Sequence, residues 1–294
     1  MNDAIIDEIN SIWSGLGAEG YLYAEDLSTH QSLDITAAAR IPLASVAKVA
    51  IVAAIINAGE LGEIDLHRRV NVDPRSSTPG GTGISGLQDP VTMSVRDLAA
   101  MALAVSDNAA ADTLFGIVGP DRISDLLNKR GIRSIAIHSP MSHLYSVIDE
   151  VAAGSEVEAL LLATEDLRSS GIPRFPDSAF NTGTARGVAK MFELIHTDEL
   201  IGSEGCATLR GLLKKQMLRH RIAAGFPMDS VGYYGKTGTF LNFRHEAGII
   251  VDADQRAFSI AVFTRSKIAA FSQPELDASI GYCARLAVEH LRSA

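Results

Sequence analysis

Positive charge, cysteine and long apolar runs are all scarce in this sequence, and each shortage excludes a class of protein. Its 26 Lys and Arg residues face 35 Asp and Glu residues, so the formal net charge is −9, which repels the phosphates of nucleic acids. Two cysteines, Cys206 and Cys283, are too few for a disulfide framework and are expected to be reduced. The longest apolar run, residues 49–56, is too short to cross a membrane. We therefore expect a protein that binds neither nucleic acid nor a membrane.

The first residues also lack the pattern of an export signal. Asp3, Asp7 and Glu8 lie in this segment, whereas a signal begins with basic residues and continues into an unbroken apolar stretch. With 47% hydrophobic and 21% charged residues, the composition is that of a globular protein. The expected location is the cytoplasm.

Strand patterns occur near both ends of the chain, and helical patterns fill the middle. The strands are predicted at 20–27, 31–36, 230–236, 246–252 and 257–264. The helices are predicted at 3–14, 45–58, 94–105, 108–119, 182–196 and 203–220, with one that ends near Gly131 and another after Pro274. The densest basic run, residues 214–221, falls largely in one of these helices and is interpreted as a solvated helix face. Residues 138–182 are less regular.

Hairpins at both ends indicate that N- and C-terminal strands share one antiparallel sheet. The predicted fold class is therefore α/β, in the form of an α+β sandwich, with helices flanking the sheet and an all-helical subdomain inserted in the middle. Residues 1–60 and 215–294 are assigned to the subdomain with the sheet, and residues 61–214 to the helical subdomain. The active site is expected between them.

Three short motifs occur in order along the chain, and together they indicate serine chemistry. They are Ser45-Val-Ala-Lys48, Ser106-Asp-Asn108 and Lys236-Thr-Gly238. Each is common by itself, but all three in this order are rare by chance. The first is predicted to open a helix, the second to lie in a break between helices and the third to end a strand.

The spacing of the first motif suits a nucleophile and its base. Ser45 and Lys48 are three residues apart, so their side chains share one helix face. A serine hydroxyl needs a base beside it, and the apolar flank of Lys48 can lower the lysine pKa enough for that role. The helix N-terminus also offers the backbone N–H of Ser45 as half of an oxyanion hole.

This trio resembles the motif set of the penicillin-recognising serine enzymes, especially class A β-lactamases, and the likeness extends over nearly the whole chain. The resemblance implies that Ser45 is the acylated nucleophile and that Lys48 is its base or organises the base. It also implies that Ser106, with Lys236 beside it, passes a proton to the leaving group. It also implies that Asn108 binds a substrate amide and Lys48, that Lys236 and Thr237 bind a substrate carboxylate, and that the backbone N–H of Thr239 completes the oxyanion hole.

The sequence departs from the class at the acid that removes the acyl group. The expected E-x-x-L-N motif is missing, and its aligned glutamate position falls near Arg168. Glu165 is the nearest acid and is taken as the candidate, with Glu156 and Glu158 as alternatives. Without a positioned base for the second water, we expect acylation to proceed and deacylation of a β-lactam to be slow.

The arginine that helps bind the substrate carboxylate is also displaced. Ala247 occupies its aligned place, and Arg244, His245 and Glu246 are the neighbouring candidates. Strand alternation puts Arg244 and Glu246 on the same face.

Two other patterns are set aside. The match to G-x-G-x-x-G at 81–86 is followed at once by Asp89-Pro90 rather than by a helix, so it predicts a flexible loop that could line the cleft. His138 and His143 lack metal-ligand spacing. We expect no metal and no other cofactor.

The sequence therefore predicts a serine hydrolase that cleaves an amide or ester through an acyl-Ser45 intermediate. Its substrate would be a small molecule with an amide, ester or lactam carbonyl and a carboxylate. One alternative is a true class A-type β-lactamase with a displaced deacylating carboxylate. Another is a non-catalytic penicillin-binding or sensor protein.

Overall fold

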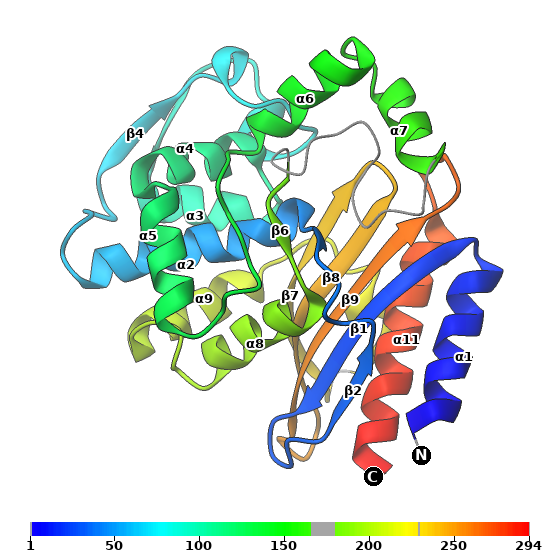
Figure 1. Ribbon diagram of the computed structural model, residues 1–294. Helices are drawn as coiled ribbons and strands as arrows, with labels where there is room; N and C mark the ends of the chain where they lie inside the picture. The colour runs from blue at the N-terminus through cyan, green and yellow to red at the C-terminus, as the bar shows by residue number, and fades with distance from the viewer. Residues whose placement is uncertain (1, 166–179, 229, 294) are drawn as a thin grey trace.

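The computed structural model describes residues 2–165, 180–228 and 230–293 (Figure 1). The helices are α1 (Asn2–Gly15), α2 (Lys48–Glu60), α3 (Val95–Ala104), α4 (Asn108–Val118), α5 (Pro120–Lys129), α6 (Ser142–Ala152), α7 (Glu156–Glu165), α8 (Ala185–His196), α9 (Ser203–Leu213), α10 (Ile222–Gly225) and α11 (Pro274–Ser293). The strands are β1 (Ala18–Asp26), β2 (Ser32–Ile35), β3 (Ile41–Pro42), β4 (Arg69–Val72), β5 (Val91–Ser94), β6 (Thr182–Gly183), β7 (Gly232–Phe240), β8 (Phe243–Val251) and β9 (Ala257–Ser266). Short 3-10 turns are η1 (Ala44–Ala47), η2 (Pro74–Ser76) and η3 (Gly83–Gly86).

The main sheet is built from both ends of the chain. Five antiparallel strands follow the order β2-β1-β9-β8-β7 (Figure 1). N-terminal strand β1 pairs along its whole length with C-terminal strand β9, for example Leu22 with Val262. This confirms the prediction that N- and C-terminal strands share one antiparallel sheet. Strand β7 lies at one edge of it.

Side chains alternate between two cores on the faces of this sheet. Leu22 of β1 packs in the cluster formed with α1 and α11, and its neighbours Tyr21 and Tyr23 pack in the larger cluster on the other side. Trp13 of α1, 1% exposed, lies directly over Gly20. A Cβ at Gly20 would be 1.9 Å from the indole ring, so glycine is required for this close approach.

Replacing Trp13 by alanine is expected to lower the free energy of unfolding by about 3–5 kcal/mol, because it removes a large buried ring and leaves a cavity. Trp13→Phe is the matched control, since it keeps a ring and removes an indole N–H that has no hydrogen-bond partner among the described residues. Urea unfolding should therefore give a smaller loss for phenylalanine than for alanine. Equal losses would contradict the packing argument.

The helical part surrounds α2. This helix is apolar on nearly all sides, and it packs against α3, α4, α5 and α9. A helix with apolar residues all round is expected at the centre of a helical layer. Its N-terminus, which begins at Lys48, lies beside the edge strand β7 through η1.

Several predicted bounds are wrong. The helix predicted at 203–220 ends at Leu213, and Lys236 lies inside β7 rather than at a strand end. The less regular segment contains α6 and α7, and the first turn of the helix predicted at 45–58 is 3-10. The helix ends early because the chain turns inward at Gln216, whose buried amide reaches Thr237 of β7.

Among the helices of the described ranges, none is both long and apolar enough to cross a membrane. The cytoplasmic location and the subdomain boundaries at 60/61 and 214/215 stay predictions.

Candidate active site

Ser45 lies in η1, the tight turn that leads into α2, and its side chain is half-buried. The preceding residue, Ala44, has φ = +48°. Left-handed backbone at a non-glycine residue is costly and persists where the surrounding fold imposes it. The residue before the predicted nucleophile is therefore held in a strained conformation.

The turn that carries Ser45 packs directly on β7. A Cβ at Gly238 would lie 2.8 Å from the carbonyl oxygen of Leu43 and 3.0 Å from the side chain of Val46. Glycine in the third motif therefore allows the backbone of β7 to approach the residues on either side of Ser45.

Lys48 connects the first two motifs. Its side chain is fully buried, and Nζ donates to Asn108 Oδ1 at 2.7 Å, to the backbone oxygen of Ser106 and to Ser106 Oγ at 3.4 Å. Ser106 has φ = +62° and lies in the break between α3 and α4, as predicted. The base candidate and the second motif thus form one hydrogen-bonded unit.

The third motif reaches the same hydroxyl. Lys236 is also fully buried, and its Nζ donates to Ser106 Oγ at 3.0 Å and to the backbone oxygen of Thr237 at 2.9 Å. The Ser106 hydroxyl therefore lies between two lysine amines. The structure brings together Lys48, Ser106, Asn108 and Lys236, with Ser45 one turn before Lys48.

Burial makes both amines easier to deprotonate. Desolvation lowers the pKa of Lys48 to about 7, although the charges of Asp107 and Asp112 oppose the shift. Desolvation also lowers the pKa of Lys236 well below its ordinary value, and the neighbouring Lys48 adds to the effect. Two close amines in a dry site cannot easily both carry charge, which favours a neutral base near pH 7.

Thr237 is held by a buried network that the sequence did not reveal. Its backbone N–H donates to Gln216 Oε1 at 2.6 Å and its hydroxyl donates to the same oxygen at 3.1 Å. Gln216 Nε2 donates in turn to Glu246 Oε1 at 2.9 Å. Burial raises the pKa of Glu246. Gln216 therefore anchors the edge of β7 next to Lys236.

Thr239 is exposed at this edge of β7, and its side chain is hydrogen-bonded to the buried guanidinium of Arg221. The guanidinium of Arg221, 2% exposed, donates to Thr239 Oγ1 at 2.7 Å and to the carbonyl oxygen of Gly238 at 2.9 Å. Its Nε donates to Asp277 at 2.7 Å. The backbone N–H of Thr237 points away from β8, toward Gln216. Because N–H directions repeat every second residue along a strand, the N–H of Thr239 points to the same side of β7.

Arg244 was one candidate for the arginine that binds the substrate carboxylate, but its guanidinium is used inside the protein. Its guanidinium donates to the backbone oxygens of Leu241, Phe243, Ala270 and Phe271. His245 Nε2 lies 2.9 Å from the backbone oxygen of Pro42, and burial lowers the pKa of this imidazole to about 3. Glu246 shares the sheet face of Arg244, as predicted, and contacts Gln216. The sequence analysis did not identify Arg221 as a site residue, because the basic run that contains it is typical of an exposed helix face. In the structure Arg221 follows the end of α9 and is buried.

The deacylating acid stays a prediction. Glu165 is the last residue of α7, but its side chain lies outside the description, as does Arg168. Glu156 and Glu158 are exposed in the first turn of the same helix.

The glycine-rich segment at 81–86 is hydrogen-bonded to Asp107 of the second motif. The backbone N–H of Ile84 and the hydroxyl of Ser85 donate to the Asp107 carboxylate at 2.7 and 2.9 Å. Asp107 also caps α4 through the N–H groups of Ala109 and Ala110. The loop predicted as flexible is thus tied to the segment that carries Asn108.

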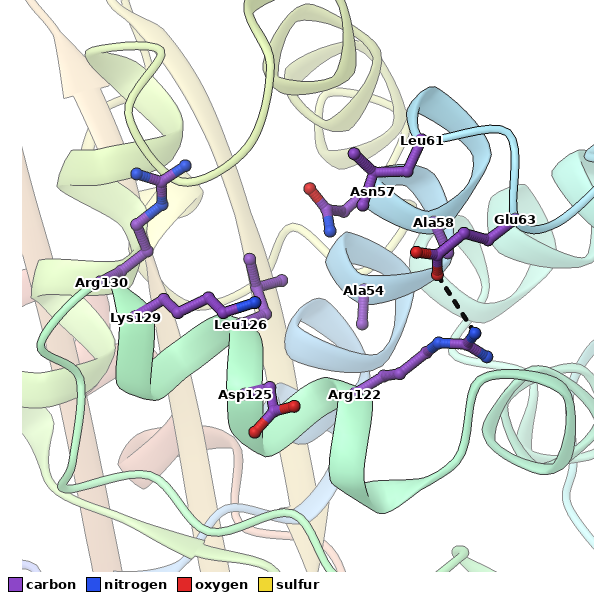
Figure 2. Close-up of a pocket in the computed structure, with 10 residues that line it drawn as sticks. All are labelled: Ala54, Asn57, Ala58, Leu61, Glu63, Arg122, Asp125, Leu126, Lys129 and Arg130. Atoms are coloured by element: carbon purple, nitrogen blue, oxygen red, sulfur yellow. Dashed lines mark ion pairs between the residues drawn. The ribbon is translucent and has the colours of Figure 1, made fainter.

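A cavity of about 390 Å³ lies away from these motifs, between α2 and α5 (Figure 2). Asn57 and Leu61 line it from the end of α2 opposite Lys48, and Arg122 pairs with Glu63 at 3.1 Å across one side. Its ten lining residues include no serine or cysteine. The motif cluster therefore stays the candidate active site, and this cavity does not.

A sequence profile and a curated relative both match nearly the whole chain. The sequence profile described as the Beta-lactamase enzyme family matches residues 4–291. A curated relative, the β-lactamase regulatory protein BlaB of Streptomyces cacaoi, is 31% identical to this chain. The match covers 99% of this chain and 98% of that protein.

Solved structures share the fold. A class A β-lactamase from Mycobacterium abscessus matches with a TM-score of 0.80 and 20% identity, over 99% of this chain and 100% of its own. The L158E variant of PBP-A, an acyl-enzyme complex with penicillin G, matches with a TM-score of 0.79 and 16% identity, over 99% and 97%. These likenesses confirm the predicted β-lactamase/DD-peptidase-like fold class.

Proposed function

Because the chain belongs to the β-lactamase enzyme family and is a β-lactamase-like serine hydrolase, we propose that it cleaves an amide, ester or lactam bond through an acyl intermediate on Ser45. One observation carries this proposal, namely that the Ser106 hydroxyl lies between two buried amines, Lys48 and Lys236, at the turn that bears Ser45. Both amines have a lowered pKa. The site can therefore hold and move a proton near neutral pH.

Acylation follows from this arrangement. Neutral Lys48 accepts the Ser45 hydroxyl proton while the serine oxygen attacks the carbonyl carbon, and the developing oxyanion lies against the N–H groups of Ser45 and Thr239. When the bond from the carbonyl carbon to the leaving nitrogen or oxygen breaks, Ser106 donates its proton to that atom. Ser106 then regains a proton from Lys48 or Lys236, which both contact its oxygen.

The exposed hydroxyl of Thr239 is proposed to bind a substrate carboxylate, together with Lys236. Thr237, predicted for the same role, donates both its N–H and its hydroxyl to Gln216. Arg221 donates to Thr239 Oγ1, so the threonine proton is oriented toward another acceptor. A guanidinium behind the hydroxyl also favours an anion there.

Thr239→Val is expected to raise the KM for a penicillin by about tenfold, since it removes one hydrogen bond to an anion and keeps the side-chain shape. The methyl ester of the same penicillin is the control substrate, because it lacks the carboxylate. Steady-state or acylation kinetics with both compounds give the answer. Equal effects on acid and ester would contradict carboxylate binding at Thr239.

The proposed activity is tested by mass spectrometry. Wild-type protein mixed with benzylpenicillin is expected to gain the mass of one ring-opened penicillin, and peptide mapping should place that mass on Ser45. Adduct on another residue, or neither adduct nor hydrolysis with benzylpenicillin and with activated ester probes, would overturn the proposal.

A regulatory role is the second candidate, favoured by the name of the relative from Streptomyces cacaoi. A protein that is acylated and stays acylated would report β-lactam without destroying it. The lifetime of the adduct separates the two candidates. An adduct that persists for hours favours the sensor, and one that is lost within seconds favours the hydrolase.

A further inference from the structure

The carboxylate of Asp112 joins three segments beside the second motif. Asp112 lies in α4, about one helical turn after Asn108, and is half-buried. It accepts hydrogen bonds from the hydroxyl of Thr78 and from the backbone N–H groups of Met141 and Ser142, the last at 2.8 Å. The loop that contains Thr78 and the start of α6 are therefore both held to α4 by one side chain.

The start of α6 depends on this carboxylate. Met141 occupies the N-cap position of α6, and its side chain makes no capping hydrogen bond. The first N–H groups of a helix have no partner inside the helix, and a negative charge placed there interacts favourably with the helix dipole. Asp112 thus supplies the missing cap from a neighbouring helix.

Both held segments contact the side-chain amide of Asn108. Its Nδ2 donates to the backbone oxygen of Pro79, in the held loop, at 2.9 Å and to the hydroxyl of Tyr145, near the start of α6, at 3.2 Å. Its Oδ1 accepts from Lys48 at 2.7 Å. An amide nitrogen has two protons, and Asp112 holds in place the segments that accept both. Because these acceptors take the nitrogen end of the amide, the oxygen end must face Lys48.

Resting on the proposed function above, we propose that Asp112 is a positioning residue for acylation, which acts through Asn108 by holding the acceptors that keep the amide oxygen on Lys48. Without these acceptors the amide can turn over and offer its N–H groups to the lysine. The lone pair of a neutral Lys48 would then accept a proton from Asn108 in a hydrogen bond and would be lost as the base for Ser45.

The negative charge of Asp112 also acts on Lys48 directly. Burial lowers the pKa of Lys48 to about 7, and the charges of Asp107 and Asp112 oppose the shift. The amine of Lys236 also contacts the hydroxyl of Ser106 that Lys48 contacts. Removing the Asp112 charge alone is therefore expected to lower the Lys48 pKa further. A residue that only stabilised the fold would leave this pKa unchanged, so a pH profile separates the two roles.

Two variants and a control test the proposal through the second-order rate of Ser45 acylation by benzylpenicillin, followed by intact-protein mass between about pH 5 and about pH 8. Asp112→Asn keeps the size of the side chain and removes its charge. Thr78→Val removes one of the three donors and keeps the charge. Asp121→Asn is the matched control, because this aspartate is exposed in the first turn of α5.

Asp112→Asn is expected to lower the plateau rate about tenfold and to move the midpoint of the pH profile lower by about half a pH unit. Thr78→Val should lower the plateau about threefold without moving the midpoint, and Asp121→Asn should change neither.

An unchanged midpoint in Asp112→Asn, or a wild-type plateau in both Asp112→Asn and Thr78→Val, would overturn the role of Asp112 while wild-type acylation still supports the proposed function. If Asp112→Asn does not fold, a wild-type plateau in Thr78→Val overturns that role by itself. If the wild-type protein is neither acylated on Ser45 nor able to hydrolyse benzylpenicillin or activated esters, both proposals fall together.

Discussion

The Ser45→Ala variant is expected to form no acyl adduct with benzylpenicillin and to lose hydrolytic turnover by about a million-fold, the scale seen when a serine nucleophile is removed from a coupled catalytic unit. The reason is positional as well as chemical. Ser45 follows a residue held at φ = +48° and lies in a turn pressed against Gly238. Another hydroxyl cannot take its place without rebuilding that turn.

Intact-protein mass after incubation with benzylpenicillin is the direct measurement, with ester hydrolysis as the second readout. Ser203→Ala is the matched control, because this serine is exposed in the first turn of α9. It should keep wild-type adduct formation. A Ser45→Ala protein that still gains the adduct, or still turns over at the wild-type rate, would show that the nucleophile lies elsewhere.

The parts that the sequence predicted correctly depend on local patterns. The β1–β2 hairpin follows from two apolar runs around a polar turn, and the break at Ser106 follows from the cap at Asp107. The pairing of N-terminal with C-terminal strands, seen in β1 and β9, could also be predicted from the sequence. Strands at the two ends of a chain whose middle is helical have few other partners. The structure also brings together Lys48, Ser106 and Lys236, one residue or more from each motif, while their catalytic roles stay predictions.

The parts that sequence reasoning missed are long-range contacts of polar side chains. Gln216 and Arg221 lie in a run whose charges indicate a solvated helix, yet the chain leaves α9 at Leu213 and buries both against β7. Their partners are 17 to 56 residues away in sequence, so the contacts depend on how α11 packs against the sheet.

Burying an amine costs free energy because its hydration is lost, and Lys48 and Lys236 are both fully buried. The fold offsets this cost by giving each amine several acceptors and by placing the carboxylates of Asp107 and Asp112 near Lys48. Those carboxylates limit the fall of the Lys48 pKa to about 7. The balance leaves a base that is half protonated near neutral pH.

Replacing Lys48 by methionine is expected to slow Ser45 acylation by about a thousand-fold, within the range for loss of a general base. The neutral amine is the active form and predominates above its pKa of about 7. The wild-type acylation rate should therefore rise from about pH 5, pass half its maximum near the lysine pKa and level off by about pH 8. Lys48→Met should remove this dependence, because no titrating base remains beside Ser45.

Lys190→Met is the control, since this lysine is exposed on α8 and pairs with Glu193 at the surface. It should keep both the rate and the pH profile. Circular dichroism and thermal unfolding check that each variant is folded. A wild-type acylation rate that stays constant between about pH 5 and about pH 8 would exclude Lys48 as the base. The proton of Ser45 would then have to leave by another group, such as Lys236 through Ser106.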